Sequence, residues 1–376
     1  MNFIKKNYQK AIFIIAFVCC IMFCSAITAH AAPIGTTMFN PLNANYGSVY
    51  TASWTRNTNN VFFYSRVNVD ETGLLKMSFS KPYDSSGEYG NLSITVSDED
   101  GEPLWSSDTY DMDKTASPYY KFNVGLKPGT YYVSIVPGFY VTSGRIETDF
   151  KFEFETNSYV EIEPNSSTSN ATELKKGHFY SATVGNGGGD FGEINFFKVN
   201  LKKNSSYRLV IDNFGAVDET SAIIDVLGPA NKDVNIYMGD FRVDSSGYQY
   251  YEFIAPSTGT YYVKVYNYSG KPIQYRLKVS NALKPSATKI TNFYNWSWNN
   301  EIEVYFEEKE NVAGYQLQYS SNKSKVKSAK IRSFTDDHVE IKVSKNYKKY
   351  YARVRTYKWI DGKKVYSKWS KIKCYY

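Results

Sequence analysis

A five-residue motif occurs twice in this chain, and the distance between its copies is that of a whole domain. Gly-Thr-Tyr-Tyr-Val stands at residues 129–133 and again at residues 259–263, 130 positions later. Three further residues recur at the same interval: Gly47, Tyr50 and Ala52 return as Gly177, Tyr180 and Ala182. A repeat of this length indicates two copies of one domain of roughly 120 residues, rather than the short units of a solenoid.

Both copies have the pattern of antiparallel β-structure. Short runs rich in Val, Ile, Phe and Tyr are separated by turn signals such as Asp100-Gly101 and Pro128-Gly129. No window beyond the N-terminal segment keeps the period of a helix. In the repeated strand, alternate residues share a face and are predicted to be core: Tyr131, Val133 and Ile135 in the first copy, and Tyr261, Val263 and Val265 in the second. Strands of this length and spacing predict a sandwich or jelly roll for each copy.

Residues 1–31 have the features of a secretory signal. Basic residues precede a continuous apolar run over residues 11–27, and Ala29-His30-Ala31 offers a cleavage site between small residues. We therefore expect a secreted protein. An uncleaved N-terminal anchor is the alternative, because the apolar run is long for a signal.

The charge of the chain is unevenly distributed. Residues 32–160 carry a net charge of −6 and residues 161–282 of −1, whereas residues 283–376 hold 20 Lys and Arg against 9 Asp and Glu, a net charge of +11. A basic C-terminal region on an acidic body favours contact with a polyanion, such as an anionic cell-wall polymer. The alternative is that evenly spread lysines keep a small domain soluble.

A polar segment between the two copies gathers candidate metal ligands. Glu161, Glu163 and Asn165 alternate along it, and Asp190 and Glu193 follow in a Gly-rich loop. Carboxylate and amide oxygens are ligands that Ca²⁺ takes, and no nucleophile or histidine accompanies them. The five residues therefore predict a structural calcium site that stiffens the linker between domains. A solvated acidic linker is the alternative.

Four of the chain's 35 tyrosines predict a binding surface. If the strands on either side of residues 256–259 pair as a hairpin, the core takes one face and Tyr248, Tyr250, Tyr262 and Tyr266 share the other. Aromatic rings with a hydroxyl group suit sugars and extended peptides, so this face is expected to bind a glycan or a fibrous protein. Cross-strand aromatic ladders that only stiffen the sheet are the alternative.

The C-terminal region, residues 283–376, resembles a fibronectin type III domain. The resemblance lies in residues 302–305 (Ile-Glu-Val-Tyr), 312–319 (Val-Ala-Gly-Tyr-Gln-Leu-Gln-Tyr), 350–355 (Tyr-Tyr-Ala-Arg-Val-Arg) and 366–370 (Tyr-Ser-Lys-Trp-Ser). It implies a β-sandwich of a kind common in surface proteins of Gram-positive bacteria. Arg353, Arg355 and Trp369 are predicted to stack as a cation–π ladder on one of its sheets.

The second copy resembles the bacterial pre-peptidase C-terminal (PPC) domain. The matching residues are Glu161, Glu163, Pro164, Asn165, Ala171, Leu174 and Gly177, then residues 195–197 and 259–262. That β-sandwich accompanies secreted proteases and includes the collagen-binding domains of clostridial collagenases. The resemblance implies that an acidic lead and an acidic loop hold calcium, with Asp190 and Glu193 in the place of the loop, and that tyrosines on a sheet face grip the ligand. The first copy resembles a divergent member without acids in its lead, so no calcium is expected there.

No catalytic motif accompanies these features. After residue 31 the chain has two histidines, His178 and His338, in different predicted domains, and one cysteine, Cys374, near its end. A lone cysteine leaves no disulfide within the mature chain. Nucleophilic catalysis needs a base beside the nucleophile, and none of these residues has such a neighbour in the sequence. We therefore expect a binding protein rather than an enzyme.

Together these features predict an all-β chain of three tandem β-sandwich domains. A signal peptide at residues 1–31 precedes two PPC-like jelly-roll domains at 32–156 and 157–282 and a fibronectin type III domain at 283–376. The expected function is non-catalytic binding of an extracellular glycan or matrix protein, in secreted or surface-associated form. The alternatives are an accessory to a hydrolase or protease, an undetected hydrolase, or a structural surface spacer. Neither nucleic acid nor a membrane span is expected of the mature protein.

Overall fold

The computed structural model describes residues 38–55, 62–82, 92–109, 119–137, 145–185, 193–212, 222–229, 233–234, 241–267, 272–296, 300–344 and 349–375. Almost all the regular structure in them is β-strand, apart from one short 3-10 helix, η4 (Lys323–Ser328). The all-β prediction is therefore confirmed. Within the same residues, no helix has the length and apolar character needed to cross a membrane. The predicted signal at residues 1–31 lies outside them.

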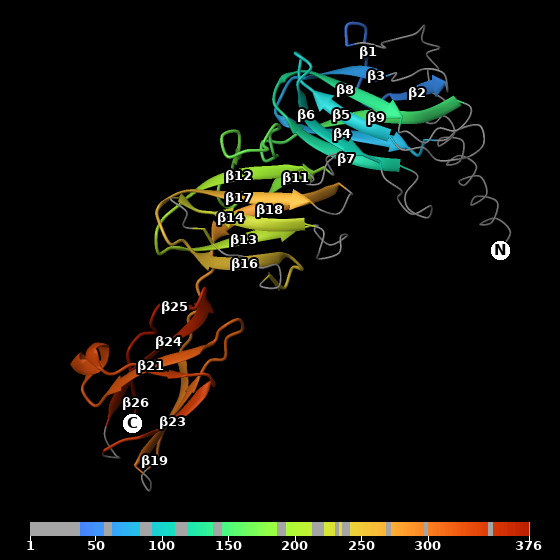
Figure 1. Cartoon of the computed structure of the whole chain (residues 1–376). Helices are drawn as coiled ribbons and strands as arrows, with labels where there is room; N and C mark the ends of the chain where they lie inside the picture. Colours follow the sequence, from blue (N-terminus) through green and yellow to red (C-terminus); the bar gives the residue numbers. More distant parts are fainter. Residues whose placement is uncertain are drawn as a thin grey trace, which may run out of the picture. The chain divides into compact units, whose positions relative to one another are not determined.

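The first copy forms two facing sheets (Figure 1). Its strands are β1 (Leu42–Asn43), β2 (Val49–Thr55), β3 (Phe63–Val69), β4 (Gly73–Ser80), β5 (Leu92–Ser97), β6 (Pro103–Asp108), β7 (Tyr119–Leu126), β8 (Gly129–Pro137) and β9 (Arg145–Thr156). Sheet A has the order β1-β3-β8-β5-β6, and sheet B has the order β2-β9-β4-β7. Val133 of sheet A and Phe122 and Phe150 of sheet B belong to one buried cluster, which makes the pair a sandwich.

The second copy repeats this arrangement. Its strands are β10 (Thr172–Glu173), β11 (Tyr180–Val184), β12 (Ile194–Leu201), β13 (Ser206–Asp212), β14 (Ala222–Leu227), β15 (Arg242–Val243), β16 (Gln249–Ile254), β17 (Gly259–Asn267) and β18 (Ile273–Asn281). Sheet C has the order β11-β18-β13-β16-β15, and sheet D has the order β10-β12-β17-β14. The rings of Phe197 in sheet D and Tyr275 in sheet C meet edge to face at 6.4 Å, which places these two sheets face to face.

Repeated residues make the same contacts in the two copies. The hydroxyl of Tyr50 accepts a hydrogen bond from the backbone N–H of Asn45 at 2.8 Å, and that of Tyr180 accepts one from Lys175 at 2.9 Å. Gly47 and Gly177 both have positive φ, at 81° and 91°, a conformation that favours glycine. The duplicated strand also keeps its place, because β8 pairs with β3 and β5 as β17 pairs with β12 and β14. These contacts explain why those residues recur.

The third region forms a smaller sandwich. Its strands are β19 (Ile290–Trp296), β20 (Glu301–Phe306), β21 (Gly314–Ser320), β22 (Arg332–Phe334), β23 (His338–Lys342), β24 (Tyr350–Ile360), β25 (Lys363–Tyr366) and β26 (Lys373–Tyr375). Sheet E has the order β19-β20-β23, and sheet F has the order β22-β21-β24-β25, with β26 also on β24. Val304 of sheet E and Leu317 and Val354 of sheet F share one core.

The predicted cation–π ladder is present on sheet F. The Arg353 and Arg355 guanidinium groups lie 4.4 and 4.5 Å from the centre of the Trp369 ring. Gln318 and Gln316 each accept a 2.9 Å hydrogen bond from the Nε of one arginine, Arg353 and Arg355 respectively. The glutamines fix the arginines for stacking, so this prediction is confirmed.

By its contacts the chain divides into two compact units. One comprises Met1–Leu201, Val210–Tyr250 and Gly259–Val279, and the other comprises Lys202–Leu209, Tyr251–Thr258 and Ser280–Tyr376. Described strands pair only within the ranges 32–156, 157–282 and 283–376. The domain boundaries drawn at those positions remain a prediction.

Candidate functional site

The polar segment before β10 that contains residues 160–165, here called the lead, lies beside β11. Val160 forms a parallel bridge with Ser181, and the backbone N–H of Glu161 donates to the Ser181 carbonyl at 2.9 Å. On the other side, the N–H of Glu163 donates to the carbonyl of Gly125 in β7 at 3.2 Å. Glu161, Glu163 and Asn165 are all buried, and Asn165 donates hydrogen bonds to the other two side chains, from its backbone N–H to Glu163 and from its amide to Glu161.

Glu161 is the centre of this buried cluster. Its carboxylate accepts hydrogen bonds from the backbone N–H of Thr183 in β11 and, at 2.6 Å, from the side-chain amide of Asn195 in β12. The side-chain amide of Asn165 approaches the same carboxylate at 3.4 Å. Asn195 also donates to the Tyr275 hydroxyl at 3.2 Å. Among the described residues, this fully buried carboxylate is thus held by amide and backbone donors and not by a basic side chain.

Four buried oxygens around this carboxylate have no hydrogen-bond partner among the described residues. They are Glu163 Oε1, Asn165 Oδ1, Thr183 Oγ1 and Asn195 Oδ1. Buried polar atoms in native proteins are nearly always satisfied, and exceptions commonly mark the place of an ion or a water molecule. All four can act as acceptors, and oxygen acceptors of these kinds are ligands of Ca²⁺. The donor set therefore fits a hard cation.

Burial opposes negative charge in this cluster. It raises the pKa of the Glu163 carboxyl to about 8, although the Asn165 N–H, which donates to that carboxyl at 3.0 Å, acts in the other direction. Burial also raises the pKa of Glu161 and of Glu193 well above the ordinary value, and the charge of Glu163 raises each further. A carboxyl whose pKa is raised above 7 is mostly protonated at neutral pH unless a nearby cation compensates its charge.

Glycines allow the backbone to close around the cluster. A Cβ at Gly125 would lie 1.7 Å from the carbonyl oxygen of Glu161, and one at Gly185 would lie 2.4 Å from the carbonyl oxygen of Ser106 and 2.6 Å from Glu193 Oε2. No side chain larger than hydrogen fits at either position without a shift of the backbone. Gly185 also donates its N–H to Glu193, which brings that carboxylate to the site.

The structure brings together three of the five predicted metal ligands, because Asn165 donates hydrogen bonds to the carboxylates of both Glu161 and Glu163. The charge of Glu193 acts on Glu161 and raises its pKa, and Asp190 lies outside the described residues. Among the residues that are described, no three Asp, Glu, His or Cys side chains form a group that could hold a metal by themselves. The site therefore depends on amide and hydroxyl oxygens as well.

Two contributors were missed by sequence reasoning, Thr183 and Asn195. Asn195 occupies a core-facing position of β12, where the alternation of the strand calls for an apolar residue. A polar residue at a core position is a signal that could have been read from the sequence. Thr183 is buried in β11 and gave no comparable signal.

The predicted four-tyrosine surface is not formed, because the two strands that carry it belong to different sheets. The strand β16 lies in sheet C between β13 and β15, whereas β17 lies in sheet D between β12 and β14. Tyr250 and Tyr262 therefore belong to separate faces of the sandwich. Tyr248 lies next to sheet C, where its ring meets that of Phe179 at 5.3 Å. The connection from β16 to β17 crosses from one sheet to the other, and the hairpin expectation was wrong.

The two remaining tyrosines belong to a broader face, the outer face of sheet D. Its partly exposed residues form three cross-strand rows, each with one residue from β12, β17 and β14: Ile194, Tyr266 and Ile223; Phe196, Lys264 and Asp225; Lys198, Tyr262 and Leu227. The Lys264 ammonium group lies 4.3 Å from the centre of the Tyr266 ring. Six of the nine side chains are aliphatic or aromatic, and a charged pair occupies part of the middle row.

The histidines have structural surroundings. His178 stacks on Tyr159 with ring centres 4.1 Å apart, and His338 stacks on Tyr305 at 5.6 Å with Asp337 3.4 Å from its Nδ1. Cys374 is exposed and forms no disulfide. Neither described histidine contacts a Ser or Cys nucleophile in the hydrogen bonds and ring contacts that it makes.

No family model and no curated protein matches the chain. Among solved structures, the pre-peptidase C-terminal domain of collagenase from Bacillus anthracis aligns with 30% of this chain and 98% of that chain, at 13% identity and a TM-score of 0.22. The FN1–FN3 domains of chicken CNTN1 align with 82% of this chain and 99% of that chain, at 12% identity and a TM-score of 0.22. The adhesin domain of Epf from Streptococcus pyogenes aligns with 48% and 70%, at 13% identity and a TM-score of 0.21. None of these likenesses is close enough to support an argument about what this chain binds.

Proposed function

We propose that the chain is a secreted, non-catalytic binding protein that holds an extended extracellular polymer, a glycan or a fibrous protein, on the outer face of sheet D. The observation that carries this proposal is the set of three cross-strand rows, in which Tyr262, Tyr266 and Phe196 present large rings on one partly exposed sheet surface. Core burial does not require these rings, because the inward side of β17 is filled by Tyr261, Val263 and Val265.

The chemistry of this face suits an extended ligand. Neighbouring strands lie about 4.8 Å apart and successive outward residues about 7 Å apart, so the rows form a flat surface rather than a pocket. Tyrosine contributes apolar area together with a hydroxyl group that exchanges hydrogen bonds with a ligand. Lys264 and Asp225, paired across β17 and β14, give the middle of the surface one charge of each sign. Such a surface recognises a polymer along its length instead of enclosing a small molecule.

The first copy provides an internal comparison. The corresponding rows of sheet A run across β3, β8 and β5: Tyr64, Ser134 and Thr95; Arg66, Tyr132 and Ser97. Here Ser134 stands where the second copy has Lys264, and β5 contributes Ser93 and Ser97 at the positions of Ile223 and Leu227 in β14. Rings are present in the first copy too, because Phe62 is exposed and stacks on Tyr64 at 5.6 Å. The second copy therefore differs in the charged pair and in the aliphatic side chains of β14, and not in having rings on this face.

We propose further that a calcium ion stiffens the lead of the second copy. Glu161, Glu163, Asn165 and Glu193 would hold it together with Thr183 and Asn195, and Asp190 is the predicted further ligand. The ion would supply the positive charge that these buried carboxyls lack, and the unpartnered oxygens support its presence. Because the lead bonds to both β7 and β11, a bound ion would fix it to the two copies at once.

The polymer proposal is tested by binding of the mature protein to arrayed glycans and matrix proteins. The Tyr262→Ala/Tyr266→Ala variant should lose retention on whichever polymer holds the wild type, and its thermal midpoint should stay close to that of the wild type. The matched control is Tyr132→Ala at the equivalent position of the first copy, which should bind normally. Undiminished binding of the double variant would remove sheet D from the proposal, and turnover of any arrayed polymer would replace binding with an enzymatic function.

A further inference from the structure

On one side of the last sandwich, the two sheets end on strands that are consecutive in the chain and that each have a single described partner. Among the described strands, β23 pairs only with β20 at the end of sheet E, and β22 pairs only with β21 at the end of sheet F. The two strands are consecutive in the chain and are joined by residues 335–337. A strand with one partner presents a row of backbone N–H and C=O groups to whatever lies beside it.

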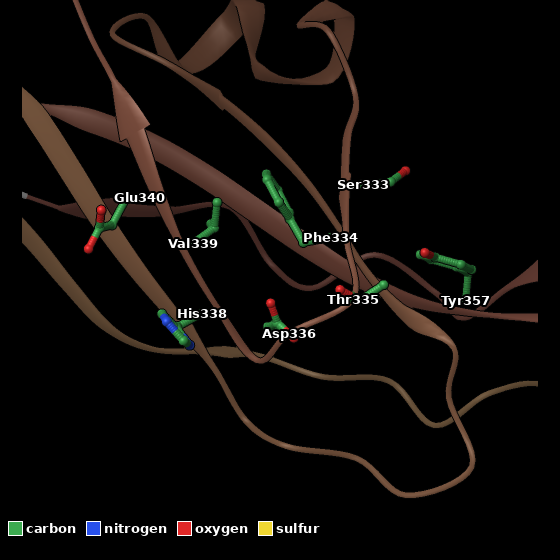
Figure 2. A pocket seen from close by; sticks show the side chains of 8 residues that line it. All are labelled: Ser333, Phe334, Thr335, Asp336, His338, Val339, Glu340 and Tyr357. Atoms are coloured by element: carbon green, nitrogen blue, oxygen red, sulfur yellow. The ribbon is translucent and has the colours of Figure 1, made fainter.

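An open groove of about 600 Å³ runs between these two strands. Figure 2 shows the side chains that line it: Ser333, Phe334, Thr335, Asp336, His338, Val339, Glu340 and Tyr357. Its floor is apolar, since Val339 and Tyr357 are buried and Phe334 is partly buried. Its rim is polar, with Asp336, His338 and Glu340 exposed. The groove therefore combines a strand edge, an apolar floor and an acidic rim.

The charge of the groove is opposite to that of its region. The described residues that line it include two carboxylates, Asp336 and Glu340, and neither Lys nor Arg. An adjoining hollow of about 410 Å³ adds Asp337, Glu308 and one lysine, Lys309. The ammonium group of that lysine lies 3.0 Å from the carboxylate of Glu307, so its charge is already compensated. Within a region of net charge +11, this is a local site of negative charge.

We propose that this groove binds an extended, basic segment of a partner protein, which adds to the edge of β23 as a further strand. Backbone hydrogen bonds to β23 would supply affinity, and alternate side chains of the segment would supply specificity. Val339 and Ile341 face the core, whereas His338, Glu340 and Lys342 face outward. The segment should therefore alternate apolar residues above Val339 and Phe334 with basic residues, one opposite Glu340 and one near Asp336.

A second copy of the chain suits this edge less well than a basic partner. Two regions that each carry +11 repel one another on approach, whereas a Lys- or Arg-rich segment is attracted to the carboxylates of the rim. A strand of five residues is also short for an interface between two copies without other contacts. This inference is independent of sheet D, because no residue of the second copy lines the groove.

The test is fluorescence anisotropy with the full mature protein and a labelled peptide of about ten residues that alternates Lys and Val. The wild type should bind this peptide and not its Glu-Val counterpart. A Lys-Val peptide N-methylated at alternate residues should bind weakly, because it lacks the backbone donors for β23. The Asp336→Asn/Glu340→Gln variant should bind the Lys-Val peptide about tenfold or more weakly, since two charge-assisted contacts are lost.

Three controls make the result decisive. Glu310→Gln changes an exposed carboxylate of the same region outside the groove and should bind as the wild type does. Tyr262→Ala/Tyr266→Ala should also bind normally, which separates this groove from sheet D. Thermal melting should show that the groove variant is folded. Absence of Lys-Val binding, or equal binding by the groove variant, overturns the proposal. Sedimentation that shows a dimer dispersed by the groove variant also overturns it, because the edge would then belong to a second copy.

Discussion

The side-chain amide of Asn195 donates to the Glu161 carboxylate at 2.6 Å, across 34 positions of sequence. Asn195 comes from β12 and Glu161 from the lead before β10, so the bond fastens the lead to the inside of the second sandwich. It leaves Asn195 Oδ1 buried without a partner, beside other oxygens in the same condition. An arrangement that satisfies one buried charge and leaves several acceptors open is expected where a cation completes the site.

Calcium should stabilise the protein, and Glu163→Gln should remove the effect. A ligand that binds only the folded state at about 100 times its Kd adds about 2.7 kcal/mol to the free energy of unfolding. Melting in calcium should therefore occur at higher temperature than melting in chelator, and residues 157–176 should resist protease only with calcium. In chelator, Glu163→Gln should be about as stable as the wild type, because a carboxyl with a pKa of about 8 is already mostly neutral at neutral pH.

The matched control for that variant is Glu173→Gln, an exposed carboxylate of β10. It should keep the full response to calcium. If calcium changes neither the melting temperature nor the proteolysis of the wild type, the lead is an acidic linker whose buried oxygens are satisfied in another way.

Gly125→Ala should destabilise the packing of β7 against the lead. A Cβ there would lie 1.7 Å from the carbonyl oxygen of Glu161, so the backbone of the lead must move. We expect a loss of about 2–4 kcal/mol in the free energy of unfolding, the range of severe overpacking and lost buried hydrogen bonds. Urea denaturation measures it. Gly129→Ala is the control, because the nearest atom to its Cβ would be the Tyr131 hydroxyl at 3.3 Å. Similar losses in both variants would refute the close approach.

The sequence predicted the strands and their inward faces because alternation and repetition are local patterns. Tyr131, Val133 and Ile135 are buried, as are their counterparts Tyr261, Val263 and Val265. Local alternation does not record which sheet a strand joins. The strands β16 and β17 are consecutive in the chain but lie in different sheets. The tyrosine surface was wrong for that reason alone.

Only the part of the candidate metal site that is close together in sequence could be predicted. Glu161, Glu163 and Asn165 are close in sequence, so the short segment that holds them brings their side chains within hydrogen-bond distance of Asn165. Thr183 and Asn195 reach the same point through the parallel contact of the lead with β11 and through sheet D, and such long-range pairings are set by tertiary packing. The open groove beside β23 likewise depends on which strands remain at sheet edges, which no local pattern specifies.

Alanine variants of two adjacent tyrosines on β17 should show which ring stabilises the fold and which one is available for binding. Tyr261 is fully buried, whereas Tyr262 is partly exposed on the outer face of sheet D. Tyr261→Ala should cost about 3–5 kcal/mol, as for other large-to-small changes in cores. Tyr262→Ala should cost about 1 kcal/mol or less. Denaturant titration of each variant measures both values. A loss of several kcal/mol for Tyr262→Ala would show that the ring is part of the core and would weaken the polymer proposal.

Binding to an anionic cell-wall polymer through the basic region should depend on salt and on the lysines of η4. Lys323, Lys325 and Lys327 are exposed on this short helix, where Val326 is the buried residue. The Debye length falls from about 10 Å at 0.1 M salt to about 3 Å at 1 M, so attraction between exposed charges is screened over this range. Retention on a wall-polymer column should therefore fall steeply with salt.

The variant in which all three lysines are changed to Gln should elute earlier than the wild type. The variant in which all three are changed to Arg should elute together with the wild type. Equal elution of the Gln variant and the wild type would show that η4 takes no part, and retention indifferent to salt would show that the contact does not depend on exposed charge.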